Sequence, residues 1–450
     1  MDDAMRKKLL ASYRGLRVEA EATALRLGEL AELPMREVQS AALLREVLCA
    51  HGFRIEREFE LIPNAFIAAA GRGRPVVGIL AEYDALPDCG VDGRSPGHGC
   101  GHNLLGTAST FAAIALARVL EANSIRGTVK LFGCPAEETL VGKVYMARDG
   151  AFGGLDACLA WHPSTATNVD NGSGAAMDSI AYEFFGKTAH AAADPHNGRS
   201  ALDAVEIMNV AVNFLREHIP SNVRIHYAIM DGGKAPNVVP PYARSWYYIR
   251  GRDREQVKEI SERVDNCARG AALATDTEMR RSMLAACYDR LPNEALSQAL
   301  DRSLHAVGAP RFSAADRATA AELGLKNGLS GEVGAIRTGR GTASSDEANV
   351  SWLAPLGRLN TACWAKGTPG HHLLVHRQAQ LPAAMKGMAV AIKTLSLTGL
   401  DLMTDPDLRR RAKSEFRKLT KGTCYDPVIP IGQPAPIQDR LVHRSTTDES

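Results

Sequence analysis

The first 52 positions place apolar residues at helical spacing. Leu43, Leu44, Val47 and Leu48, for example, fall on one side of a helix. Beyond them, short apolar runs alternate with helical stretches. We expect strands at 59–70, 76–81, 127–133 and 157–161, a turn at 71–75 and a buried helix of small residues at 104–120. Continuous apolar strands alternating with helices predict the α/β class, with a mostly parallel sheet covered by helices on both faces.

The pattern changes in the middle of the chain. The expected elements there are a strand at 179–185, an amphipathic helix at 200–218, strands at 223–229 and 244–250, a helix at 254–273 and a strand at 277–283. This order, β-α-β-β-α-β, is that of a ferredoxin-like α+β unit. We therefore predict a domain at 176–285 inserted into a first domain made of 1–175 and 286–450.

Composition narrows the class of protein and its compartment. The chain has 450 residues, and its formal net charge of +2 is too balanced to favour nucleic acid or an anionic membrane as a partner. Nine cysteines is an odd number, and Cys49, Cys158 and Cys267 have the contexts of buried thiols, which favours a reducing compartment. The first eight residues lack the apolar core of a secretory signal. The longest uncharged run, 103–117, is shorter than the roughly 18 residues of a membrane span. These features predict a cytoplasmic protein.

Polar groups follow three of the predicted strands. Glu82–Pro87 follows the strand at 76–81, Pro135–Glu138 follows that at 127–133, and His162 follows that at 157–161. A glycine-rich loop, Ser95–Asn103, carries Cys100 and His102, and a distant segment, Gly367–His372, carries two adjacent histidines. Because sites in open parallel sheets lie beyond the carboxyl ends of the strands, we expect these groups to converge.

Each group by itself also has a purely structural explanation. Adjacent glutamates are usually a solvated face, and a single histidine is more often a satisfied core residue than a ligand. Together, however, thiolate, imidazole and carboxylate groups make a donor set that suits zinc or manganese. Five candidate ligands exceed the three or four that one catalytic ion needs, which indicates two ions. One of the paired glutamates can then bind metal while its neighbour serves as a general base.

A thiol hydrolase that uses Cys100 with His102 is a weaker alternative. The two residues are two positions apart in a glycine loop, which is poor geometry for a nucleophile and its base, and no third orienting group is evident.

Four motifs resemble those of a known family. Gly99–Asn103, Cys134–Glu138, Trp161–Pro163 and Gly367–His371 are similar to motifs of the di-metal aminoacylase and carboxypeptidase G family of metallopeptidases, clan MH. The likeness is to its Cys-Gly-His subfamily, which includes aminoacylases, auxin-conjugate hydrolases and, most similar here, p-aminobenzoyl-glutamate hydrolases. It extends in order from about residue 10 to about residue 430 and includes Gly186–Ala191 and Ala235–Pro240.

The resemblance implies a role for each residue of the first domain's motifs. The metal ligands would be Cys100 as a bridging thiolate, His102, Glu138, His162 and His371. Glu137 would be the general base, and Asp84 would support a ligand without binding metal. The spacing from Pro369-Gly370 favours His371 over its neighbour His372. Glu82 occupies the place where the wider family has the histidine of a His-x-Asp pair.

The resemblance also assigns the inserted domain, as a dimerisation or lid domain. His190 would reach the partner subunit's site and stabilise the developing oxyanion; alone, it would be a surface histidine before a helix. Asn237 and Arg250 would hold the substrate's carboxylate or carbonyl, although Arg250 could equally form a strand-end ion pair.

The implied function is a metal-dependent amidohydrolase. It would cleave N-acyl amino acids, such as p-aminobenzoyl-glutamate or indole-acetyl-aspartate, by attack of a metal-bound hydroxide with Glu137 as general base. Its partners would be two Mn or Zn ions per subunit and a second copy of the chain, with no nucleic acid or membrane. A dipeptidase or carboxypeptidase on the same scaffold and a non-catalytic metal-binding scaffold are the alternatives. Thr139–Gly142 departs from the glycine-rich turn of many relatives, which leaves the substrate open.

Overall fold

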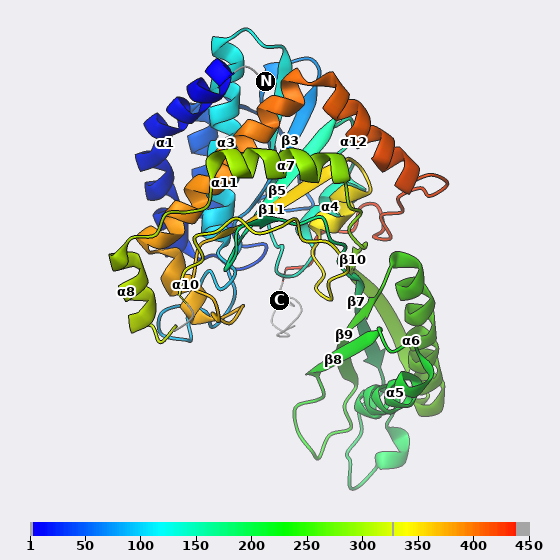
Figure 1. Ribbon diagram of the computed structural model, residues 1–450. Coiled ribbons are helices and arrows are strands. Elements are labelled where there is room, and N and C mark those ends of the chain that lie inside the picture. The colour runs from blue at the N-terminus through cyan, green and yellow to red at the C-terminus, as the bar shows by residue number, and fades with distance from the viewer. Residues whose placement is uncertain (1–2, 326–327, 438–450) are drawn as a thin grey trace. The chain divides into compact units, whose positions relative to one another are not determined.

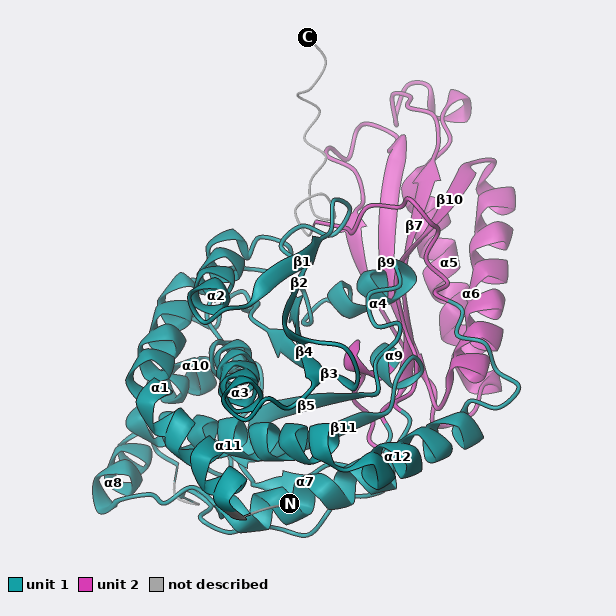
Figure 2. Ribbon diagram, turned by 90° about the horizontal axis from the view of Figure 1, so that it is seen from above, with its two compact units in different colours: residues 1–173, 291–340, 349–426 teal, residues 174–290, 341–348, 427–450 magenta. Residues whose placement is uncertain are grey.

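The computed structural model describes residues 3–325 and 328–437 of the chain. It divides into two compact units, shown in teal and magenta in Figure 2. Unit 1 takes in residues 1–173, 291–340 and 349–426, and unit 2 takes in 174–290, 341–348 and 427–450, of which 438–450 lie outside the described residues. Each unit is described by itself below.

Unit 1 is built on one sheet, part of which is labelled in Figure 1. Its strands are β1 (Arg54–Glu58), β2 (Phe66–Arg72), β3 (Val76–Glu82), β4 (Gly127–Cys134), β5 (Ala157–Ser164), β6 (Asn168–Val169) and β11 (Leu356–Ala362). They lie in the order β1-β2-β4-β3-β5-β11-β6. The central strands β4, β3, β5 and β11 are parallel, and β1, β2 and β6 pair antiparallel at the two sides. The predicted α/β class is confirmed, and the antiparallel outer strands make the sheet mixed.

The first two predicted strands differ in detail from those observed. The run at 59–70 becomes a strand only at Phe66, because the preceding Pro63-Asn64 makes a turn in which Asn64 has a φ of 70°. β2 and β3 follow each other in the chain but are not paired, because β4 lies between them.

Helices cover one face of this sheet with an apolar layer. The helices of unit 1 are α1 (Asp3–Leu30), α2 (Val38–Ala50), α3 (His102–Ala122), α4 (Gly142–Arg148), α7 (Glu294–Val307), α8 (Ala314–Glu322), α10 (Leu373–Ala379), α11 (Pro382–Thr404) and α12 (Pro406–Leu419), while α9 (Glu347–Ser351) spans the boundary between the units. α3 packs against α1, α11 and β3, and these elements share one core with α7. The other face is covered in part by the segment after α4, where Phe152 packs on Phe132 with ring centroids 4.9 Å apart.

α3 is the predicted helix of small residues. Among the described helices it is the one long and apolar enough to cross a membrane, but 89% of its most apolar window is buried inside the protein, as in a core helix. Its fully buried face includes Ala108, Ala112 and Ala115, whose small side chains let α1 and α11 approach closely.

Unit 2 has the predicted ferredoxin-like order. Its elements are β7 (Ala176–Phe185), α5 (Ala201–Leu215), β8 (Arg224–Asp231), β9 (Tyr242–Gly251), α6 (Arg254–Thr275) and β10 (Glu278–Cys287), with short 3₁₀ turns at Pro195–Asn197 and Arg216–His218. The sheet order is β10-β7-β9-β8, and every pairing is antiparallel. Ser200 and Asp253 cap the two helices by accepting backbone N–H bonds, which explains why the helices begin there.

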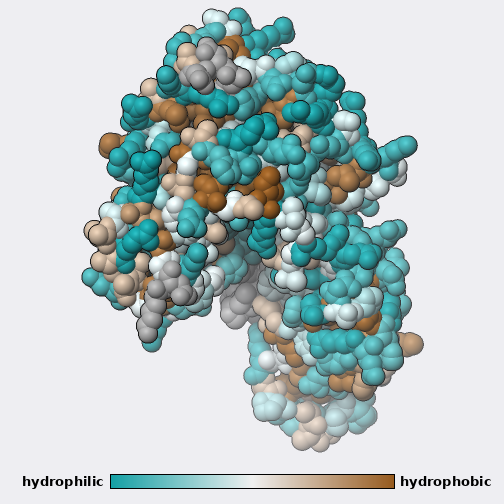
Figure 3. All heavy atoms as spheres, in the orientation of Figure 1, coloured by the Kyte–Doolittle hydropathy of each residue, from teal (hydrophilic) through white to brown (hydrophobic). Residues whose placement is uncertain are grey.

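Two of the three predicted buried thiols are not fully buried. Cys158 is buried in β5, but Cys267 is half-buried and Cys49 is exposed. The buried residues of α2 include Ala41, Leu44 and Leu48, so Cys49 turns toward solvent one position beyond that face. All nine cysteines are free thiols. The face in Figure 3 is mostly hydrophilic, with hydrophobic residues in separate patches.

Candidate metal centre

The polar groups predicted from unit 1 come together at one edge of its sheet. β3 ends at Glu82, and Asp84 follows it; β4 runs into the turn that carries Glu137 and Glu138; β5 contains His162 near its carboxyl end. These strands are neighbours in the order β4-β3-β5, so their carboxyl ends meet at the same edge.

The glycines around Cys100 and His102 allow close packing. Gly101 has a φ of 75° and is the N-cap of α3, so His102 is the first residue of that helix. A Cβ at Gly101 would lie 2.8 Å from the Trp364 ring, and one at Gly99 would lie 2.7 Å from the Cys89 sulfur. The glycine-rich loop therefore brings a thiol and an imidazole into a crowded interior, where larger residues would collide.

Asp84 fixes the orientation of His102. Its Oδ1 is 2.8 Å from His102 Nδ1, and its Oδ2 accepts the Glu138 backbone N–H at 2.9 Å. The carboxylate thereby holds Nδ1 of the fully buried imidazole and leaves Nε2, which has no hydrogen-bond partner. A buried nitrogen held in this way is typical of a metal-ligating histidine.

His162 is oriented by the backbone in a similar manner. Its Nδ1 donates to its neighbour's carbonyl, Pro163 O, at 2.7 Å, so Nε2 keeps its lone pair. That Nε2 lies 3.3 Å from the Cys100 sulfur. A neutral imidazole and a thiol are thus placed side by side.

Glu138 and His371 form the other side of the cluster. His371 Nε2 lies 3.4 Å from Glu138 Oε2, and Glu138 Oε1 is buried without a hydrogen bond. His371 has a left-handed φ of 53°, while His372 caps α10, its Nδ1 accepting the Leu374 backbone N–H. The geometry therefore supports His371, rather than His372, as the candidate ligand.

These side chains form overlapping groups of donor atoms. Cys100, His102 and His162 make one group, Cys100, Glu138 and His371 make a second, and Glu82, His102 and Glu137 make a third. Within each group the donor atoms lie within 4.8 Å of one another. The first two groups share the Cys100 sulfur, which fits a thiolate between two ions. The unsatisfied Nε2 of His102 and Oε1 of Glu138 are the atoms that bound ions would satisfy.

The electrostatics of the cluster also fit bound cations. Burial raises the pKa of Glu137 to about 7, and the Glu82 carboxylate adds to this effect. Burial likewise raises the pKa of Glu138 to about 8 and that of the Cys100 thiol to about 12. Burial lowers the pKa of His162 to about 3, which keeps its imidazole neutral. A divalent cation would stabilise the ionised carboxylates and thiolate that crowd here, and it would bind neutral imidazole.

Two supporting residues were missed from the sequence. Lys143, in α4, is fully buried with Nζ 2.8 Å from Glu82 Oε1. Glu37 is fully buried and accepts the Ala136 backbone N–H at 2.8 Å, so it holds the turn before Glu137. Lys143 has no sequence signal of burial, since it occurs in a short helix. Glu82, at the end of a buried apolar strand, did signal that a partner cation was needed.

The remaining predicted residues belong to unit 2 and are not part of this cluster. His190 is exposed, and its Nδ1 accepts the backbone N–H groups of Ala192 and Ala193 at 3.3 and 3.1 Å, which places its proton on Nε2. Asn237 is exposed, and its carbonyl accepts the Ala191 N–H. Arg250, on β9, is half-buried, and its Nε is buried without a hydrogen bond.

Comparisons with known proteins agree with this architecture. Residues 175–276 match the family described as the peptidase dimerisation domain. The chain is 37% identical to a p-aminobenzoyl-glutamate hydrolase chain of Escherichia coli K12, over 90% of this chain and 94% of that one. It is 30% identical to Xaa-Arg dipeptidase of Mus musculus, over 79% of this chain and 78% of that one. A solved structure of a dinuclear metal-binding M20 peptidase from Bacillus subtilis matches with a TM-score of 0.57 and 19% identity, covering 87% of this chain and 99% of that one.

Fold, buried donor groups and relatives together define a metal-dependent hydrolase of amide bonds. More particularly, the chain belongs to the M20 family of metallopeptidases and amidohydrolases. The family resemblance seen in the motifs is thereby confirmed.

Proposed function

We propose that the protein hydrolyses the amide bond of N-acyl amino acids, with an aromatic acyl group and an acidic amino acid as the preferred halves. The observation that carries this proposal is the pair of donor groups that share Cys100, with the Glu137 carboxylate beside them. The 37% identity to a p-aminobenzoyl-glutamate hydrolase over nearly the whole chain supports the choice of substrate class.

The proposed ligands are Cys100, His102, Glu138, His162 and His371. Two divalent ions held there, Mn or Zn, would polarise the scissile carbonyl and acidify a water molecule. A soft thiolate and three imidazoles favour zinc, and the carboxylates suit manganese as well, so the donor set alone leaves both metals open.

Glu137 is the proposed general base. Its Oε2 lies 4.0 Å from His102 Nε2, so it borders the ligand cluster, and its side chain keeps 12% exposure toward solvent. From this position the carboxylate can take a proton from water and return it to the departing amino group. Asp84 positions His102 for this chemistry and takes no part in it directly.

Unit 2 supplies the proposed substrate contacts. Neutral His190, with its proton on Nε2, is suited to donate a hydrogen bond to a developing oxyanion, and we propose that it acts on the substrate bound by the partner subunit. Arg250 stacks on Tyr248 at 5.8 Å and has an unsatisfied Nε, which supports a role in binding a carboxylate. Asn237 is proposed to bind the substrate's carbonyl or carboxylate.

We also propose a homodimer formed through unit 2. Ile207, Val210 and Phe214 are 41%, 51% and 72% exposed and lie at helical spacing on one face of α5. β8 is an outer strand of the four-stranded sheet and exposes Ile229. An apolar helix face and an unpaired strand edge are surfaces that a second copy can cover.

Release of amino acid from a small substrate panel tests the proposal. The panel consists of p-aminobenzoyl-glutamate, indole-acetyl-aspartate, an N-acetyl amino acid and an Xaa-Arg dipeptide, each assayed with Mn²⁺, with Zn²⁺ and with chelator. We expect chelator-sensitive release that is fastest from an aromatic acyl-glutamate or acyl-aspartate. Preferential release from the dipeptide would replace the proposal with a dipeptidase, which the mouse relative makes the second candidate. No release from any member by protein holding two ions would refute it.

A further inference from the structure

A buried carboxylate outside the proposed ligand set faces the metal centre. Glu82 is the last residue of β3 and is 4% exposed. Its two oxygens have different neighbours: Oε1 lies 2.8 Å from Lys143 Nζ, and Oε2 lies 3.5 Å from His102 Nε2.

The second contact is not a hydrogen bond. A separation of 3.5 Å exceeds the usual range of about 2.7–3.2 Å for a nitrogen–oxygen hydrogen bond. It does suit two donors of one ion, because ligand bonds of about 2.1 Å at a tetrahedral angle place the donor atoms about 3.4 Å apart. His102 Nε2 is also the nitrogen that Asp84 leaves free for a ligand role.

Glu82 further belongs to a compact donor group. With His102 and Glu137 it forms a set of three buried residues whose ligand atoms lie within 4.8 Å of one another. Glu137 is proposed to move protons, which leaves Glu82 as the carboxylate of that set available to an ion.

Lys143 explains how this carboxylate is kept ionised and in place. A carboxylate buried in an apolar environment without a counter-charge would be neutralised, and a protonated acid is a poor ligand. The ammonium group of Lys143 is fully buried and 2.8 Å from one oxygen, so it balances the charge and leaves the other oxygen directed at His102. β3 and α4 are thus joined by an ion pair at the edge of the site.

We propose that Glu82 is an additional ligand of the ion bound by His102, and that Lys143 is the positioning residue that holds its carboxylate there. The inference rests on the proposed function, since it deepens the same site. It adds a hard oxygen donor to a set that otherwise gives that ion sulfur and nitrogen, which would strengthen manganese binding more than zinc binding.

Metal affinity of the full-length chain, stripped and titrated with Zn²⁺, Mn²⁺ or Co²⁺ against a chromophoric chelator, tests the proposal. For Glu82→Gln we expect about 10–100-fold weaker binding of one of the two ions, with a larger loss for Mn²⁺ than for Zn²⁺. The visible spectrum of the Co²⁺-loaded protein should change in Glu82→Gln, because it reports the ligand set. Lys143→Met should weaken the same ion, and Lys143→Arg should restore most of the affinity.

Two controls separate this role from a merely structural ion pair. The double variant Glu82→Gln, Lys143→Met leaves no uncompensated charge, so it guards against loss of folding in the single variants. Asp178→Asn breaks the buried Asp178–Arg254 pair of unit 2 and should lower the melting temperature without changing metal affinity. A double variant that binds both ions as tightly as wild type, with an unchanged Co²⁺ spectrum, would overturn the inference alone. Wild-type protein that binds two ions but hydrolyses no amide would overturn the proposed function alone.

Discussion

At the scale of single residues, Glu137 and Glu138 are adjacent in the chain but have different surroundings. Asp84 accepts the Glu138 backbone N–H, and the Glu138 carboxylate faces His371. Glu137 instead faces His102. The sequence predicted that one glutamate would bind metal and the other would move protons. The division of roles needs the turn, in which Ala136 has a left-handed φ of 54°.

Replacement of Glu137 tests that division. Glu137→Gln should lower kcat by about 10²–10⁴-fold, because the amide cannot accept a proton. The variant should still hold as many ions as wild type, measured by elemental analysis alongside initial rates. Glu138→Gln is the matched control and should lose bound metal. Near-normal turnover of Glu137→Gln would reject Glu137 as the base.

Asp84 offers a second test at this scale. Asp84→Asn keeps the shape of the side chain but has one acceptor oxygen where two are used, by His102 Nδ1 and by the Glu138 N–H. We expect metal binding to weaken by about 10–100-fold in a chelator-competition titration. Unchanged affinity would mean that the carboxylate does not orient the ligand.

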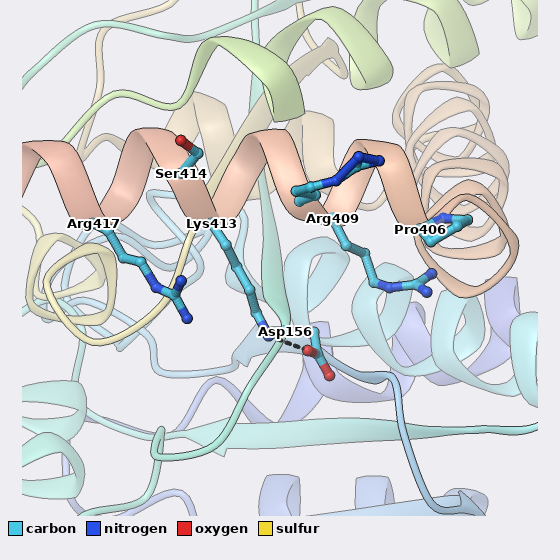
Figure 4. Close-up of a pocket in the computed structure, with 7 residues that line it drawn as sticks. Asp156, Pro406, Arg409, Lys413, Ser414 and Arg417 are labelled. Carbon is cyan, nitrogen blue, oxygen red and sulfur yellow. Dashed lines mark hydrogen bonds and ion pairs between the residues drawn. The ribbon is translucent and has the colours of Figure 1, made fainter.

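At the scale of elements, α12 is tied to the sheet through Asp156, which directly precedes β5 at the end opposite His162. Asp156 accepts the Val76 backbone N–H at 2.7 Å and pairs with Arg74 at 2.9 Å and with Lys413. Figure 4 shows Lys413 reaching from α12 to Asp156, with Arg409 and Arg417 on either side. The hollow has a volume of about 460 Å³ and is lined mainly by basic side chains of α12.

This carboxylate should make stability depend on pH. Burial alone would raise the pKa of Asp156, but the hydrogen bonds from Lys413, Val76 and Arg74 outweigh it and lower the pKa below 3.8. A lowered pKa stabilises the folded state above the unfolded value and loses that contribution as pH falls through the folded value. At pH 7, Asp156→Asn should therefore reduce the free energy of unfolding by about 1–3 kcal/mol.

Urea unfolding at pH 7 and at pH 3 measures this effect. The gap between wild type and Asp156→Asn should narrow as the pH is lowered past 3.8. Metal affinity should not change, because Asp156 lies at the opposite end of β5 from His162. A gap that is the same at both values would contradict the role of the ionised carboxylate.

The element scale also marks a limit of the sequence pattern. The apolar runs located β3, β4 and β5, and the split order located the strands of unit 2. The pattern did not reveal that β4 enters between β2 and β3, because hydrophobic runs carry no information about which strands pair. Antiparallel pairing at the outer strands escaped it for the same reason.

At the scale of the whole molecule, assembly is the property to test. Phe214→Glu should convert the proposed homodimer to a monomer, because a charge on the exposed apolar face of α5 would be buried at the interface. Light scattering after size-exclusion chromatography measures the mass. Leu273→Glu, which changes an 86%-exposed leucine on α6, is the control and should remain dimeric. A wild-type monomer, or a dimeric Phe214→Glu, would refute the interface.

The sequence by itself determined the elements, the inserted α+β order and the residues able to bind metal, because periodicity, caps and donor chemistry are local properties. Only the tertiary structure decided which donors share an ion. Cys100, Glu138 and His371 come from segments far apart in the chain and meet where the strands and α3 place them. It also decided the burial of Lys143 beside Glu82. The ionisation of a buried charge depends on its neighbours in space, and those neighbours are fixed by packing rather than by position along the chain.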